Sequence, residues 1–454
     1  MDTSEKVKKQ KISHNSSPKS LLDLNDDCLE KIFSYFTIRE LIDLENVCLR
    51  FWSIAECFYK KQDLLEINVE YHSKEHIGDL AVRLGPYVSK LNVTGRTNKI
   101  YVLKFLSKID DEPRFIAVET FQPLWLHCSN LKLLIVQNVD LRDHLPLMQE
   151  TFKSLRVASM IRCGLTDEIG EYLKTADELH NLSLEGNPEI KGSFLPDLKD
   201  QLKKIDLSRC ENIFEGSAFA QFCQNNLKLE TLSLSLPLSY DPYTQPDTIM
   251  EHLDKLKKLE SLEMIYDAMA PPSEYSPVFP KLKHLNLRPN DYLVFGLSSP
   301  MSNFLNSVAT TDSVEDLYIG GSFDFDFDGL LPKFTRLVRF KVSMIMNQFK
   351  ESHHLAINME SRQTLEHLDI PQDQITEEGL LEFVKDCPKL KYLNIRLNHN
   401  ITDDFVHGLL PYLKHRTQCL ELCCNSTRIT EDMEKEIIDR GISKIHFNWN
   451  LLTN

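Results

Sequence analysis

Residues 390–405, LKYLNIRLNHNITDDF, contain one complete unit of the pattern that decides the fold of this 454-residue chain. Leu393 and Ile395 are two residues apart, so in a short strand both side chains point to the same side, into a core. The polar Asn398 follows and is expected to pair with loop backbone that would otherwise lack a hydrogen-bond partner. Thr402 then precedes acidic residues, a combination that favours the N-terminus of a helix. The unit therefore predicts a strand, a loop and a helix.

The same spacing, Leu-x-x-Leu-x-Leu, recurs along most of the chain. Clear copies begin at residues 131, 179, 202, 229, 259, 282, 314, 337, 365 and 390, and weaker ones at 155, 417 and 442. Two earlier units, at 64 and 88, fit the same frame. From 131 to 442 the mean period is about 26 residues, and repeats of this length build solenoids. The polar anchor recurs as Asn187 and Cys210, and the threonine cap recurs as Thr166, Thr376 and Thr430.

A single strand and helix cannot bury their own apolar edge, so the units must stack on one another. The pattern resembles the cysteine-containing and ribonuclease-inhibitor-like subclasses of the leucine-rich-repeat family. This resemblance implies an α/β fold over residues 61–454: a curved solenoid of about 13 to 15 repeats, with parallel strands inside and helices outside.

The first sixty residues differ from the repeats. Residues 1–20 are polar and lysine-rich, and are predicted to form a disordered tail because they have too little apolar surface to repay the entropy of ordering. Residues 21–60 contain three helical patterns. Asn25 or Asp26 can cap the first helix, and Thr37 with Glu40 forms a capping box for the second. The apolar stripes of the three helices carry Leu29, Ile32, Phe33 and Phe36; Leu41 and Leu44; and Val47, Phe51, Ala55 and Phe58, with Trp52 beside the third.

A unit this small and apolar is expected to pack against a neighbour, either the following domain or another chain. Its residues resemble the F-box, although Asn25 stands where that family usually has proline. The resemblance implies binding to a Skp-type adaptor and, through it, to a cullin-RING ubiquitin ligase. Carried over position by position, the implied adaptor contacts are Leu24, Asn25, Leu29, Ile32, Phe33, Leu41, Leu44, Val47 and Trp52. The alternative from the residues themselves is a helical cap that closes one end of the repeat array.

In the repeat frame, the third, fifth and seventh positions face away from the core and should form the inner, concave wall. Read down the later repeats, these positions are His284, Asn286, Arg288; Asp316, Tyr318, Gly320; Arg339, Lys341, Ser343; His367, Asp369, Pro371; and Tyr392, Asn394, Arg396. We expect the four cations among them to approach one another and to receive an acidic or phosphorylated segment of a substrate, since guanidinium groups suit planar anions. The predicted substrate-binding residues are His284, Arg288, Tyr318, Arg339, Lys341, Tyr392 and Arg396. The alternative is a solvated strand face, partly paired with Asp316 and Asp369.

Composition narrows the function further. A net charge of −15 argues against a chain that mainly coats nucleic acid or anionic membrane. No apolar run of about 18 residues and no signal sequence are present, so we expect a cytoplasmic or nuclear protein without membrane contact. The eleven cysteines have no zinc-knuckle spacing and are expected to be free thiols.

Two short motifs imitate metal sites. Residues 324–329, DFDFDG, begin like a calcium loop but lack its later ligands, and the pair His353 and His354 has no third ligand at a fitting distance. We therefore expect no metal and no cofactor. No phosphate-binding loop, nucleophile elbow or thioester cysteine domain is recognisable either.

The sequence therefore predicts a non-enzymatic substrate receptor of a Skp-cullin-F-box ubiquitin ligase. Its repeats would hold a protein for ubiquitin transfer by other subunits, leading to proteasomal degradation. The alternative is a ligase-independent leucine-rich scaffold or GTPase regulator with a helical cap.

Overall fold

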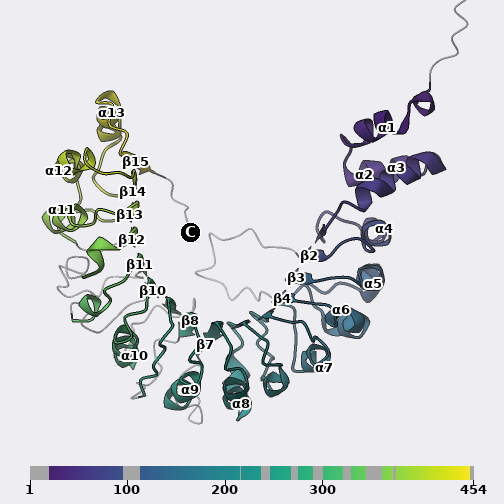
Figure 1. Cartoon of the computed structure of the whole chain (residues 1–454), viewed down its shortest axis with the longest axis horizontal. Helices are drawn as coiled ribbons and strands as arrows, with labels where there is room; N and C mark the ends of the chain where they lie inside the picture. Colours follow the sequence, from purple (N-terminus) through teal and green to yellow (C-terminus); the bar gives the residue numbers. More distant parts are fainter. Residues whose placement is uncertain are drawn as a thin grey trace, which may run out of the picture.

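The computed structural model describes residues 20–95, 113–214, 216–236, 246–266, 275–289, 300–320, 329–343, 360–371 and 375–449. Within these residues the chain forms a curved, nearly closed horseshoe in which strands line the inside and helices the outside (Figure 1). The predicted α/β solenoid is confirmed. The calcium-like loop, except for Gly329, and the pair of histidines at 353 and 354 lie outside the described residues.

One parallel sheet runs through the whole horseshoe. Its strands follow each other in chain order without any crossover. They are β1 (Leu64–Asn68), β2 (Lys90–Thr94), β3 (Leu133–Gln137), β4 (Val157–Ile161), β5 (Asn181–Ser183), β6 (Lys204–Leu207), β7 (Thr231–Ser235), β8 (Ser261–Tyr266), β9 (His284–Pro289), β10 (Asp316–Gly320), β11 (Arg339–Ser343), β12 (His367–Asp369), β13 (Tyr392–Asn394), β14 (Leu420–Cys423) and β15 (Ile445–Asn448).

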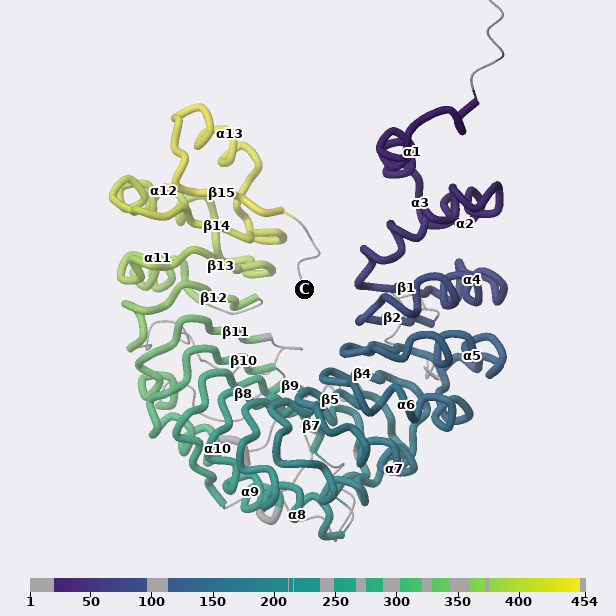
Figure 2. The backbone as a smooth tube through the Cα atoms, turned by 45° about the vertical axis from the view of Figure 1, so that its right-hand side comes forward, coloured from purple at the N-terminus to yellow at the C-terminus, as the bar shows by residue number. Residues whose placement is uncertain are grey.

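Three helices precede the sheet: α1 (Asp26–Phe33), α2 (Ile38–Glu45) and α3 (Leu49–Tyr59). The outer helices of the repeats are α4 (Lys74–Leu84), α5 (Val118–His127), α6 (Gln149–Phe152), α7 (Ile169–Leu173), α8 (Ala218–Asn225), α9 (Pro246–Leu253), α10 (Pro300–Ala309), α11 (Glu377–Lys385), α12 (Asp403–Leu413) and α13 (Glu431–Asp439). One short 3-10 turn, η1 (Leu21–Asp23), precedes α1. The others stand beside or in place of the outer helices: η2 (Arg142–Met148), η3 (Leu195–Asp197), η4 (Glu211–Phe214), η5 (Leu331–Lys333) and η6 (Glu360–Gln363). Figure 2 shows how the three N-terminal helices continue the curve at one end.

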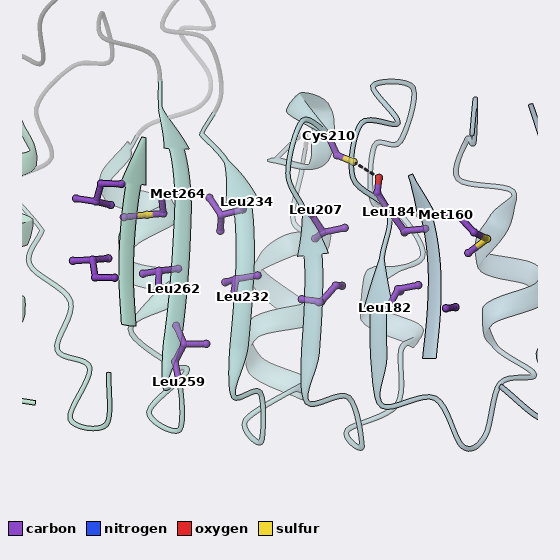
Figure 3. Close-up of a cluster of buried hydrophobic side chains, with 14 of the residues drawn as sticks. Met160, Leu182, Leu184, Leu207, Cys210, Leu232, Leu234, Leu259, Leu262 and Met264 are labelled. Atoms are coloured by element: carbon purple, nitrogen blue, oxygen red, sulfur yellow. Dashed lines mark hydrogen bonds between the residues drawn. The ribbon is translucent and has the colours of Figure 1, made fainter. Parts of the chain in front are cut away.

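The core lies between the sheet and the outer helices. Leu182, Ile205, Leu232 and Leu262 stand opposite one another on four successive strands, and all are buried. Leu207, Leu234 and Met264 form a second buried row (Figure 3). These are the inward leucines of the repeat pattern, and every strand adds its pair to one continuous apolar core.

The polar anchors behave as the sequence predicts. The buried Asn187 side chain accepts hydrogen bonds from the amides of Cys163 and Leu165, and it donates to the carbonyls of Met160 and Leu184. Cys210 donates its thiol to the Leu184 carbonyl at 3.2 Å (Figure 3). Each anchor thereby satisfies loop backbone that faces the core.

One feature of the loops was not predicted. The residue that precedes each anchor adopts a left-handed conformation in several repeats, with φ between 53° and 72° at Asn138, Arg162, Gly186, Arg209 and Leu397. Only one of these is glycine, so residue type does not reveal the turn. At Gly186 a side chain would also collide, because a Cβ atom would lie 2.6 Å from Arg162 Cγ.

Candidate interaction surfaces

Helices α1, α2 and α3 form a small module with its own core. Leu29, Phe33 and Leu41 are 0, 2 and 1% exposed. The Phe33 ring packs edge-on against Phe51, with ring centroids 5.2 Å apart. All three were predicted adaptor contacts from the sequence, but in this structure they hold the module together and have almost no surface to offer a partner.

The helix caps form as predicted. Asn25 Oδ1 accepts a hydrogen bond from the Cys28 amide at 2.9 Å, so asparagine starts α1 without the family's usual proline. Thr37 Oγ1 accepts from the Glu40 amide at 3.3 Å, while a Glu40 carboxylate oxygen accepts from the Thr37 amide at 2.7 Å. These hydrogen bonds from Thr37 lower the pKa of Glu40.

Several apolar side chains of the module remain exposed. Val47 is 63% and Trp52 46% exposed, while Leu24, Ile32 and Leu44 are half-buried against the core. Sequence reasoning missed Leu49, which is 85% exposed, as well as Leu21 and Leu22. We call Leu21, Leu22, Val47, Leu49 and Trp52 the apolar docking face. The adaptor contacts at Val47 and Trp52 stay predictions.

Arg50 joins the two parts of this face. Its guanidinium donates to the Leu22 carbonyl at 2.7 Å and to the Leu24 carbonyl at 2.5 Å, and it pairs with the Asp26 carboxylate. These bonds tie the N-terminal turn η1 and the start of α1 to the start of α3.

The module is joined to the solenoid by a buried polar cluster. Glu45 is only 7% exposed, and it accepts a hydrogen bond from the Tyr59 hydroxyl at 2.8 Å. Arg83, from the first outer helix α4, forms an ion pair with Glu45 and a second one with Asp79. Burial and the neighbouring Glu45 raise the pKa of Tyr59. The first repeat thus covers one side of the module and leaves the apolar docking face uncovered.

The strand register places the predicted inner-wall residues side by side. The first inner row runs from β1 to β15 through Leu64, Lys90, Leu133, Val157, Asn181, Lys204, Thr231, Ser261, His284, Asp316, Arg339, His367, Tyr392, Glu421 and His446. The second inner row runs through Glu66, Asn92, Ile135, Ser159, Ser183, Asp206, Ser233, Glu263, Asn286, Tyr318, Lys341, Asp369, Asn394, Cys423 and Asn448. The predicted frame is therefore correct.

The predicted cationic cluster is wrong in its charge balance. Arg339 pairs with Asp316 of the neighbouring strand, and the same carboxylate oxygen contacts His284. Lys341 Nζ lies 3.6 Å from an Asp369 oxygen and 5.0 Å from the centroid of the Tyr318 ring. These cations are thus neutralised across the strands, as in the alternative reading from the sequence.

The other two cations of the predicted cluster, Arg288 and Arg396, interact with different partners. Arg288, on β9, pairs with Glu263 of β8 and therefore lies on the side away from β11. Arg396 follows β13 and donates through Nε to Asn394 Oδ1 at 3.0 Å. On the same strand row, the Tyr392 and His367 rings lie 5.8 Å apart. Substrate binding by these residues stays a prediction.

Two carboxyl groups on the inner wall have pKa values above their ordinary range. Burial raises the pKa of Asp369 against the opposing effect of Lys341 and Arg396. Burial also raises the pKa of Glu263, and the neighbouring carboxylates of Asp206 and Glu185 add to that effect while Arg288 opposes it.

No family model and no curated protein matches this chain. Similar solved structures include the internalin inlF from Listeria monocytogenes, at 15% identity over 84% of this chain and 90% of that one, with a TM-score of 0.42. The crystal structure of the Rad7 and Elc1 complex in yeast is similar at 14% identity over 96% and 99%, with a TM-score of 0.46. At these identities and TM-scores the similarities carry no information on partners or activity.

The described residues contain no cluster of three or more histidine, cysteine, aspartate or glutamate side chains arranged to hold a metal ion. The cysteines are unpaired thiols. Within the described ranges, no helix has the length and apolar character needed to cross a membrane.

Proposed function

We propose that this chain is a non-catalytic substrate receptor of a ubiquitin ligase. Its N-terminal module docks a Skp-type adaptor of a cullin-RING ligase, and its solenoid binds the protein to be ubiquitinated. The observation that carries the proposal is the apolar docking face: the module completes its own core and is covered on one side by the first repeat, yet Val47, Leu49 and Trp52 remain exposed. A cluster of this kind marks a surface for protein binding.

The shape of the solenoid supports its proposed role. The described residues form a curved inner wall of fifteen parallel strands, which would present one side-chain set per repeat to a bound protein. Holding that protein near a charged conjugating enzyme raises the effective concentration of the reacting groups, and this step needs no nucleophile in the receptor.

Copurification with the adaptor tests this function. We expect the full-length wild type to bring down a Skp adaptor and a cullin, and the double variant Val47→Asp, Leu49→Asp to lose both. Two charges in place of apolar contacts should weaken binding by about 100-fold or more, because each buried aliphatic side chain contributes roughly 1.5–3 kcal/mol. Leu29 is unsuitable for this test because a charge there would unfold the module.

The matched control is Val82→Asp on α4, which replaces an exposed aliphatic side chain outside the module. It should leave adaptor binding unchanged. Failure of a folded wild type to bind any Skp adaptor would overturn the proposal and favour the ligase-independent scaffold with a helical cap.

A further inference from the structure

The inner wall carries an apolar patch on β3 and β4. Leu133 and Val157 stand opposite each other in the first inner row, and Ile135 lies in the second. Ile161, opposite Gln137, adds a third row at the ends of these strands. All four aliphatic side chains are partly exposed, and they face away from the core that holds Leu134. We call Leu133, Ile135, Val157 and Ile161 the inner apolar patch.

The patch has no role in building the strands. The next repeats place Asn181 and Ser183, then Lys204 and Asp206, at the positions of Leu133 and Ile135, and they form the same parallel ladder. β-Branched and aliphatic side chains stabilise a strand mainly through packing and burial, and these four do not pack against the apolar core of the solenoid. Their partial exposure, next to strands β5 and β6 that carry polar residues at the same positions, marks a surface that a partner covers.

Two carboxylates, Glu185 and Asp206, lie beside the patch in the two repeats that follow it. The Arg162 amide donates to the Glu185 carbonyl at 2.8 Å, which continues the β4–β5 pairing and sets Glu185 beside Ile161. Asp206, one strand further, accepts hydrogen bonds from the Ser208 amide at 3.0 Å and the Ser183 hydroxyl at 3.3 Å.

Among the described residues, these two carboxylates have no cationic partner. Neither Glu185 nor Asp206 forms an ion pair with a residue that the structure describes, whereas Arg339, Lys341 and Arg288 elsewhere on the wall are each paired. Lys204, on the same strand as Asp206, does not pair with it. The Arg162 side chain lies against Gly186 and has a partner of its own. Among the described residues the two carboxylates beside the apolar patch thus stay unpaired, which favours a ligand with a cationic group.

We propose that the inner wall over β3 to β6 binds a protein segment in which aliphatic residues are followed by lysine or arginine. The inference deepens the proposed function, on which it rests, by naming the chemistry of the substrate segment. Adjacent strands lie about 4.8 Å apart, so β4 and β6 are separated by about 10 Å, a distance that about three extended residues span. A basic group three or four residues beyond the aliphatic anchor therefore reaches Asp206.

Direct binding of synthetic peptides to the full-length chain tests the inference. The probe is a fluorescein-labelled peptide of four aliphatic residues, a three-residue Gly-Ser-Gly spacer and four lysines, measured by fluorescence anisotropy. One comparison peptide has four glutamates in place of the lysines, and another has four serines in place of the aliphatic residues. We expect the lysine peptide to bind at least about tenfold more tightly than either, with the advantage over the glutamate peptide shrinking in high salt.

Two double variants locate the site. Ile135→Thr with Val157→Thr removes apolar surface but keeps β-branched side chains, and Glu185→Gln with Asp206→Asn removes the charge at nearly constant shape. Each should weaken the lysine peptide at least about tenfold. Val82→Thr on α4 and Glu431→Gln on α13, both exposed on the outer helices, are the matched controls and should bind like wild type.

Three kinds of result would overturn the inference. The first is a negative result with the peptides: all three bind equally, or both double variants bind the lysine peptide as wild type does. The second is a wild-type dimer in sedimentation that the Ile135→Thr, Val157→Thr variant disperses, which would assign the patch to a second copy. The third is binding that appears only after residues 96–112 are replaced by a short linker, which would assign the patch to the chain itself. Adaptor copurification with the same variants separates this inference from the proposed function, since it depends on the N-terminal module alone.

Discussion

His144 is a buried imidazole in the core near α5. The Trp125 indole N–H lies 3.4 Å from its Nδ1, and its Nε2 lies 3.0 Å from the Ile116 carbonyl. Because a carbonyl only accepts, Nε2 carries the proton and Nδ1 accepts from the indole. Burial lowers the pKa of His144, since the charged form would lose its hydration and would turn Nδ1 from an acceptor into a donor facing the Trp125 N–H.

This environment predicts an acid-sensitive step in stability. The folded pKa of His144 lies below the ordinary value of about 6.5, so the unfolded chain takes up the proton first as the pH falls. Stability is fully present above about pH 6.5 and is lost as the pH falls below it, by at most about 1.4 kcal/mol per pH unit from this one group. His144→Gln should flatten the curve of unfolding free energy against pH between about 6.5 and 5.

The matched control is His446→Gln on β15, where the imidazole is exposed. It should leave the slope as in wild type. An unchanged slope in His144→Gln, measured by denaturant unfolding at each pH, would contradict the assignment.

At the scale of elements, the acid that follows each threonine cap links one repeat to the next. A Glu377 oxygen accepts from the Thr402 amide at 2.6 Å and from its hydroxyl at 2.8 Å. Asp403 accepts from the amide and hydroxyl of Thr430, both at 2.8 Å. The Asp167 carboxylate accepts hydrogen bonds from three backbone amides of the following loop. Sequence reasoning assigned these acids only to their own helix.

Removal of one such link should act locally. Asp403→Ala deprives the Thr430 amide of its acceptor, and we expect a loss of about 1–3 kcal/mol that is confined to the C-terminal repeats. Hydrogen exchange should therefore accelerate in α13, β14 and β15 but not in β3 to β8.

Asp404→Ala provides the control, because this carboxylate is exposed and forms no hydrogen bond or ion pair with a described residue of the next repeat. Uniform acceleration along the whole chain in Asp403→Ala would show that the link acts globally, against this expectation.

At the scale of the whole molecule, the ion pair between Glu45 and Arg83 sets how the module sits on the solenoid. Glu45 is buried while Arg83 comes from α4, so the pair crosses the boundary between the two parts. Arg83→Met leaves a buried carboxylate without its cation and should cost about 3–5 kcal/mol. We expect faster hydrogen exchange in α2 and α3 and weaker adaptor binding.

The double variant Glu45→Gln, Arg83→Met should recover most of that loss, because glutamine still accepts from Tyr59 and no charge is left buried. Asp79→Asn, at the more exposed partner of Arg83, should change stability by less than about 1 kcal/mol. A double variant no more stable than Arg83→Met would show that the buried charge is not the cause.

Charge is also distributed unevenly along the inner wall. Arg339 and Lys341 are paired with Asp316 and Asp369 on neighbouring strands, and Arg288 with Glu263, whereas Glu185 and Asp206 have no such partners among the described residues. The carboxylates that are unpaired among the described residues therefore lie beside the inner apolar patch.

The sequence by itself determined the repeat frame, the strand rows, the buried leucines, the polar anchors and the caps at Thr376, Thr402 and Thr430, because each depends on contacts within one unit or on a strict period. The predicted cap at Thr166 is wrong, because α7 begins at Ile169 with Glu168 at its N-cap position. The tertiary structure decided which apolar residues of the N-terminal module are core and which are exposed. Leu29 and Val47 look alike in an apolar stripe, and only the packing of three helices against α4 separates them. The tertiary structure also decided which charged side chains of the inner wall are paired. Arg339 and Asp316 are 23 residues apart and meet only because their strands are neighbours in register.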